Sequence, residues 1–102
     1  MTTIWKERRW TTTDNKAIEI TVWYHKPDDV DDNRFYGMSV YPVTIERGFI
    51  SAECYSGYKV KLFDVTRKSA KSDAKAIDIA RNHYLDEMIE KVCIKNNLKL
   101  ED

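Results

Sequence analysis

The chain has 102 residues, 42% hydrophobic and 33% charged, which is typical of one globular domain and not of a disordered segment. Its 17 basic and 17 acidic residues give a net charge of zero, which argues against an acidic DNA mimic and against a polybasic nucleic-acid coat. We therefore treat residues 1–102 as a single domain, with strands within 1–66 and a helix over 69–97.

The first residues include no apolar stretch of the kind found in a secretory signal. The sequence also lacks a run of about 18 apolar residues that could cross a membrane. We therefore expect a cytoplasmic protein without membrane contact. In that compartment Cys54 and Cys93 are expected to stay reduced rather than form a disulfide.

The first two predicted strands form a hairpin. Residues 17–26 alternate apolar and mixed side chains, which is the pattern of a strand with one buried face. Residues 4–12 form a weaker strand with charged residues at its centre, and residues 13–16 have the composition of a turn. The charges favour an edge position for the first strand.

A third strand is predicted over residues 34–45. Pro42 within it favours an edge position or a bulge, because proline cannot donate a ladder hydrogen bond. A two-residue turn at 47–48 then sets Ile45 opposite Ile50, so that apolar side chains meet.

The last two strands are predicted to form a second hairpin. A three-residue loop at 55–57, with Gly57 in the left-handed conformation, places Ala52 opposite Val60 and keeps apolar residues on one face.

From residue 69 the apolar spacing changes to three and four, which predicts an amphipathic helix over 69–97. Ser69 or Ser72 would begin the helix and Asn97 would end it. The predicted fold is α+β: an antiparallel meander of about five strands with one long C-terminal helix on one face, in two layers. The predicted core is Ile18, Ile20, Val22, Val43, Ile45, Ile50, Ala52, Cys54, Val60, Leu62, Ile77, Ala80, Tyr84, Met88 and Val92.

One helix covers only one face of a sheet, so a second face is left with large aromatic residues. The predicted register places Trp23, His25, Phe49, Tyr55 and Phe63 on it. Clustered surface aromatics mark interaction sites, and they dominate interface hot spots. The alternative is that the N-terminal strand or the acidic loop folds over this face and makes the aromatics a minor core.

The segment 27–33 is predicted to be an acidic loop, which carries Asp28, Asp29, Asp31 and Asp32. The spacing matches the first ligands of an EF-hand calcium loop, but Arg34 stands where that loop needs Gly and Val40 where it needs Glu. We therefore expect no metal, and the loop is more suited to pairing with a basic partner.

No pattern supports catalysis or a cofactor. The histidines His25 and His83 lie in no metal-binding spacing with the cysteines, and neither a CxxC motif nor a glycine-rich phosphate loop occurs. We therefore predict that the protein is not an enzyme.

Nucleic-acid binding is the second interpretation. Lys59 and Lys61 stand beside aromatics on the second face, as in sheet surfaces that bind single strands. Arg67 and Lys68 add charge before the helix. Against this stand the net charge of zero and Glu19, which shares that face.

The leading hypothesis is a non-catalytic protein-binding module that works through surface contact. Compact domains without motifs are typical of accessory proteins of phages and mobile elements, including inhibitors of host defence, although no residue identifies such an origin. Sheet-surface nucleic-acid binding is the alternative, and a homodimer through the sheet face or edge is a third arrangement.

Overall fold

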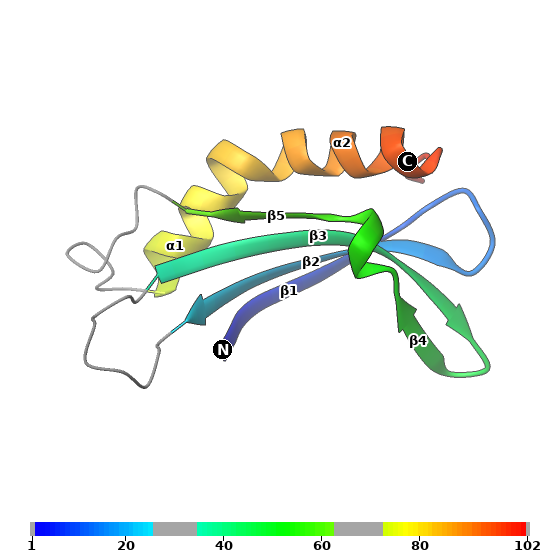
Figure 1. Cartoon of the computed structure of the whole chain (residues 1–102), viewed down its shortest axis with the longest axis horizontal. Helices are drawn as coiled ribbons and strands as arrows, with labels where there is room; N and C mark the ends of the chain where they lie inside the picture. The colour runs from blue at the N-terminus through cyan, green and yellow to red at the C-terminus, as the bar shows by residue number, and fades with distance from the viewer. Residues whose placement is uncertain (1, 26–34, 63–72, 102) are drawn as a thin grey trace.

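The computed structural model describes residues 2–25, 35–62 and 73–101. One five-stranded antiparallel sheet and one C-terminal helix form two layers (Figure 1), which confirms the predicted α+β fold. The strands are β1 (Thr2–Trp10), β2 (Lys16–His25), β3 (Phe35–Glu46), β4 (Phe49–Ala52) and β5 (Tyr58–Lys61). The helix consists of α1 (Asp73–Ile79), a π-helical turn (Ala80–Tyr84) and α2 (Leu85–Asn96).

The N-terminal hairpin agrees with the prediction. β1 pairs with β2 along almost its whole length and lies at an edge of the sheet. The end of the chain closes part of that region: Thr11 forms a bridge with Leu100, and the backbone N–H of Glu101 donates to the carbonyl oxygen of Trp10 at 3.1 Å.

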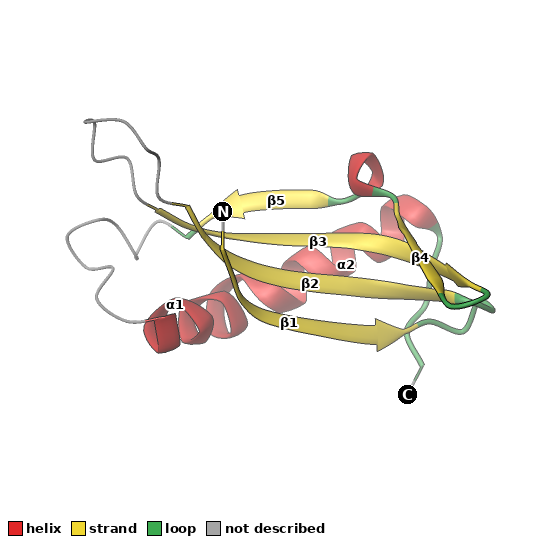
Figure 2. Cartoon of the chain, turned by 90° about the horizontal axis from the view of Figure 1, so that it is seen from below, coloured by secondary structure: helices red, strands yellow, loops and turns green. Residues whose placement is uncertain are grey.

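The other edge of β3 is shared by two short strands. β4 pairs with the C-terminal part of β3, where Ile45 lies opposite Ile50 as predicted. β5 pairs with the N-terminal part, where Lys61 lies opposite Gly37. The sheet therefore runs β1–β2–β3, with β4 and β5 in line along β3 (Figure 2).

The predicted hairpin between β4 and β5 is wrong. A single 3-10 turn, Cys54–Ser56, carries the chain past the end of β4, so that β5 takes the unused half of β3. Gly57 is not left-handed, since its φ is −107°. It is needed for space instead, because a Cβ there would overlap the carbonyl oxygen of Val40.

The position predicted for the Pro42 strand is also wrong, because β3 is central and not an edge. The carbonyl oxygen of Pro42 accepts a hydrogen bond from the backbone N–H of Glu53 at 2.9 Å. The N–H that proline lacks therefore falls on the same side, at the junction between β4 and β5. Proline is tolerated there because no strand pairs with β3 at that point.

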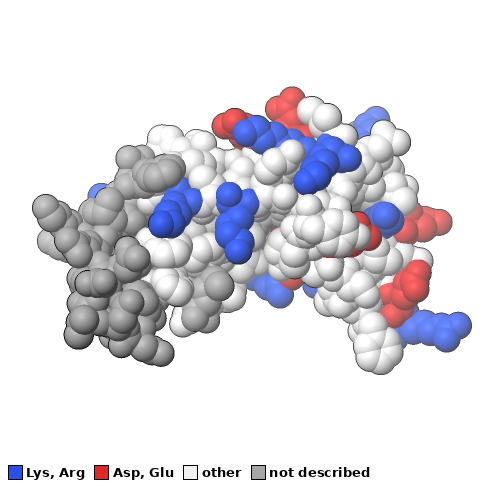
Figure 3. Space-filling model, in the orientation of Figure 1, with Lys and Arg blue, Asp and Glu red and all other residues white. Residues whose placement is uncertain are grey.

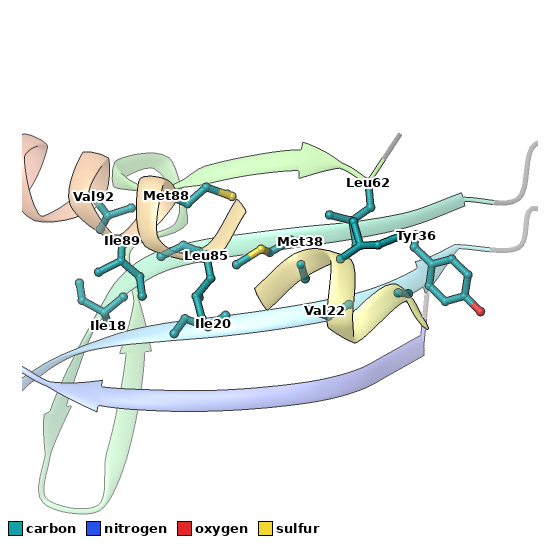
Figure 4. Packing of buried hydrophobic residues seen from close by; sticks show 14 residues of the cluster. Ile18, Ile20, Val22, Tyr36, Met38, Leu62, Leu85, Met88, Ile89 and Val92 are labelled. Carbon is teal, nitrogen blue, oxygen red and sulfur yellow. The ribbon is translucent and has the colours of Figure 1, made fainter. Parts of the chain in front are cut away.

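The core lies between the helix and the facing side of β2 and β3 (Figure 4), where Ile18, Ile20 and Met38 are fully buried. Three members of the predicted core are exposed instead: Ile50, Ala52 and Cys54. The register gives the reason for Ile50 and Ala52: they pair with Ile45 and Val43, which by strand alternation lie on the face opposite the helix-facing Met38 and Val40. The hairpin of β3 and β4 also bends away from the helix (Figure 1), and all four residues of β4 are exposed.

The helix ends as predicted, with Asn97 left-handed at φ 54°. The predicted caps Ser69 and Ser72 lie outside the described residues. Near its first turn the hydroxyl of Tyr36 donates to Asp73 Oδ1 at 2.7 Å, which ties β3 to α1. Burial, followed by this hydrogen bond, raises the pKa of Tyr36 to about 12.

Candidate binding site

We call the sheet face opposite the helix the outer face; it points towards the viewer in Figure 2, with the helix behind it. The strand registers decide which residues share it, because alternate residues of a strand point to opposite faces. Three strands supply the residues of the outer face used below. They are Glu19, Thr21, Trp23 and His25 of β2, Phe35, Gly37, Ser39 and Tyr41 of β3, and Lys59 and Lys61 of β5.

Trp23 is the centre of the outer face, and only 6% of it is exposed. Its indole lies across Gly37, its partner in β3, so closely that a Cβ on Gly37 would overlap the ring. The indole Nε1 donates a hydrogen bond to Ser39 Oγ at 3.0 Å. A glycine and a small hydroxyl residue on β3 thus make room for the ring and hold it in one orientation.

Two more rings and two ammonium groups surround this indole. Phe35 meets Trp23 edge to face, with ring centres 5.4 Å apart, and His25 lies 4.8 Å from Phe35. Lys61 Nζ lies 4.5 Å from the centre of the Phe35 ring, and Lys59 Nζ lies 6.0 Å from that of Trp23. Cation–π attraction at such distances holds the ammonium groups over the rings.

Two hollows adjoin each other on this face, and Trp23 and Lys59 line both. The first, of about 360 Å³, is mostly apolar and is completed by His25, Phe35, Val60 and Lys61. The second, of about 270 Å³, has hydroxyl groups in its wall: Thr3, Thr21, Ser39, Tyr41 and Tyr58. The Thr21 hydroxyl is buried and has no hydrogen-bond partner in the described part of the chain.

The carboxylate on this face is neutralised. Glu19 is only 3% exposed, and its two oxygens contact Lys6 Nζ at 2.6 Å and an Arg8 nitrogen at 3.1 Å. Burial would raise the pKa of Glu19, but the hydrogen bonds from Lys6 and Arg8 outweigh it and hold the pKa below its ordinary value. Glu19 therefore does not cancel the charge of Lys59 and Lys61.

The structure brings together only part of the predicted aromatic face. Trp23 and His25 lie on the same face, and both contact Phe35. Phe49 is 77% exposed on β4, and Tyr55 is 84% exposed on the 3-10 turn, so the prediction of one shared face is wrong for both. The other predicted residues lie outside the described chain: Phe63, Asp28, Asp29, Asp31, Asp32, Arg67 and Lys68.

Sequence reasoning missed the contribution of β3 to this face: Phe35, Gly37, Ser39 and Tyr41. The signal was present, since every second residue from 35 to 41 is in turn aromatic, small, small and aromatic. Small residues opposite a strand tryptophan indicate that the ring lies down across the sheet. Reading it required the register between β2 and β3, which the nine-residue gap 26–34 between these strands does not set.

The outer face offers aromatic walls, hydroxyls and ammonium groups, a chemistry suited to binding an anionic or aromatic group. Among the described residues, no three His, Cys, Asp or Glu side chains are grouped to hold a metal, and both cysteines are free. No described helix is long and apolar enough to span a bilayer. No family model, no curated protein and no solved structure matches the chain.

Proposed function

We propose that this protein is a non-catalytic protein-binding module whose outer face contacts its partner. The observation that carries the proposal is the gathering of Trp23, Phe35, Lys59 and Lys61 around two adjoining hollows. Binding hot spots combine aromatic residues with such pockets and exclude water from them. The site is also preorganised, because the Trp23 ring is fixed by Gly37 and Ser39.

A protein partner suits the dimensions of this surface. Each hollow is large enough to hold a side chain of a partner, and their shared wall makes them neighbouring subsites. Trp23 supplies a rigid wall rather than a free stacking surface, because so little of it is exposed. Lys59 and Lys61 would steer acidic groups of the partner towards the hollows.

Such a module acts by covering the surface of another protein. An accessory or inhibitory role, such as blocking a protein of host defence, needs only this contact and no chemical step. We include this inhibitory role in the proposal, and identification of the partner tests it.

The experiment is affinity capture from the native host, with the recovered protein then purified and titrated. The outer-face variant is Lys59→Glu/Lys61→Glu. Its matched control is Arg47→Glu/Lys99→Glu, which makes the same charge change at exposed residues of the β3–β4 turn and the C-terminal segment. We expect the outer-face variant to lose about tenfold or more in affinity and the control to bind as the unmodified protein does. Equal binding by both variants would refute the proposal.

Single-strand nucleic-acid binding is the second candidate, and one observation favours it. Lys6 and Arg8 neutralise Glu19 of β2, so this carboxylate does not compete with a phosphate for Lys59 and Lys61. A labelled oligonucleotide at low salt tests this directly, since phosphate contacts are strongest there. Tight binding that weakens steeply with salt and is lost in Lys59→Glu/Lys61→Glu would support this candidate over the first.

A further inference from the structure

β5 forms a border of the sheet, with β3 on one side only. In Figure 2 no described strand lies beyond it. The backbone N–H of Leu62 donates to the carbonyl oxygen of Tyr36 at 3.0 Å. The antiparallel alternation then directs the backbone N–H and C=O groups of Lys59 and Lys61 away from β3. No described strand pairs with these groups, so they can pair with one more strand.

The side chains of the same two residues lie on the outer face. Lys59 and Lys61 are two positions apart on a strand, so the bases of their side chains are separated by about 6.6–6.8 Å. Acidic residues at alternate positions of an extended segment have the same separation, so a segment laid beside β5 would set one carboxylate beside each lysine. Figure 3 shows basic side chains over β5, whereas along α2 basic and acidic side chains stand together. The charge complementary to such a segment therefore comes from Lys59 and Lys61 of β5.

The helix side of the same border is hollow as well. A cavity of about 250 Å³ lies between β5 and the helix. Tyr58, Val60, Tyr84 and Met88 form its uncharged walls, and the charged residues Lys59, Glu87 and Lys91 complete it, with Glu87 paired to Lys91 at 3.2 Å. In a strand added to β5, the residue between two acidic ones points to this side. An apolar side chain there would enter the cavity, so β5 has a subsite for each of the two alternating side-chain directions.

The other borders of the sheet lack this combination. The outermost strand β1 carries Lys6, Glu7, Arg8 and Arg9 in succession, and mixed charges on an edge discourage strand pairing. β4 has the sequence Phe-Ile-Ser-Ala, with no charged residue to select a partner. Charge complementarity and paired hollows meet only at β5 among the described strands.

We propose that β5 binds its partner by strand addition, and that the partner supplies an extended segment with acidic residues at alternate positions and apolar residues between them. In this mode main-chain hydrogen bonds provide affinity, and pockets for alternate side chains provide specificity. The inference rests on the proposed protein-binding function and adds the class of partner segment to it.

The probe is a short fluorescein-labelled peptide in which Glu and Val alternate, titrated by fluorescence anisotropy at low salt. A peptide of the same composition, with its Glu and Val residues in two blocks, is the matched control. Two further versions carry N-methyl groups, one on the Glu amides and one on the Val amides. In an added strand only one set of amides faces β5, so we expect one methylated peptide to lose binding and the other to keep it.

The protein variants test the same bonds from the other side. Lys61→Ala removes the charge alone, whereas Lys61→Pro also removes the outward N–H without touching the bonds to β3. We expect Lys61→Ala to weaken peptide binding about threefold and Lys61→Pro to weaken it by about a further tenfold. Circular dichroism and thermal unfolding check that Lys61→Pro folds, and if it does not, the methylated peptides decide alone.

Several results would overturn strand addition: equal affinity of Lys61→Pro and Lys61→Ala, binding of both methylated peptides, or equal binding of the block peptide. So would binding of a single-stranded oligonucleotide in place of the peptide, or self-association through β5 seen by light scattering. After any of the peptide results, or after self-association, the outer-face proposal stands as long as Lys59→Glu/Lys61→Glu releases the captured partner. Binding of the oligonucleotide favours the second candidate function instead. If that variant keeps the captured partner, the proposed function itself is wrong.

Discussion

The two faces of the sheet are built by the same strands but are closed in different ways. On the helix side, Ile20 and Met38 are fully buried among hydrocarbon from α1 and α2. On the outer face, alternate residues of those strands bury an indole and a carboxylate, each with hydrogen-bond partners. Because successive side chains of a strand point to opposite faces, the same strands build both surfaces. The helix-covered face supplies stability, and the outer face holds polar groups in fixed positions.

The helix-covered face should respond most strongly to substitution. Ile20→Ala removes a fully buried side chain at the centre of the core and is expected to cost about 2–5 kcal/mol of unfolding free energy. Chemical denaturation followed by circular dichroism measures this. The control is Thr21→Val on the outer face, which replaces a buried hydroxyl without a described partner and should change stability by less than about 1 kcal/mol. Equal losses would mean that the two faces do not differ in this way.

On the outer face the largest expected effect comes from adding atoms. Gly37→Ala places a Cβ into the Trp23 indole, so the ring must move, at a cost of about 1–3 kcal/mol. Near-ultraviolet circular dichroism should report the altered tryptophan environment. In a Trp23→Leu background the same substitution should cost much less, because the clash is gone. A full cost in that background would show that Gly37 matters for another reason.

Much of this contrast could be predicted from sequence. The alternation in β2 and the helical spacing of 73–96 identify the two layers, because each pattern needs a buried partner. The turn at Arg47 and Gly48 also follows from local chemistry, and both residues have positive φ.

The paths of β4 and β5 could not be predicted in the same way. Both hairpin and in-line arrangements bring apolar residues together, and what decides is the unused length of β3, a non-local quantity. The missed outer-face residues of β3 have the same cause, since their position depends on pairing with β2 across a long connection. Local patterns give elements, whereas registers across long connections depend on the whole packing.

The ion pairs of Glu19 make the outer face sensitive to acid. Because the folded-state pKa of Glu19 is lowered, its stabilisation is present above its unfolded value of about 4.3 and is lost as the pH falls through the folded value. Glu19→Gln should cost about 1–2 kcal/mol at neutral pH, and the difference should shrink as the pH falls through the lowered folded-state pKa. Denaturation at several pH values tests this. Glu7→Gln, in a more exposed pair with Arg9, should cost less than about 0.5 kcal/mol.

The smallest effect is expected where a polar bond borders the hydrocarbon face. Tyr36→Phe removes the hydrogen bond to Asp73, at a cost of about 1 kcal/mol. Because the folded pKa of Tyr36 is raised to about 12, its contribution is full below the unfolded value of about 10 and is lost as the pH rises through the folded value. The stability difference between the two proteins should therefore disappear in alkali, and Tyr36→Phe should remove a late step from the absorbance titration of tyrosinate. Tyr55→Phe, at an exposed side chain, serves as the control. If it removes the same late step, the assignment of that step to Tyr36 is wrong. The helix-covered face would then have no polar bond comparable to those of the outer face.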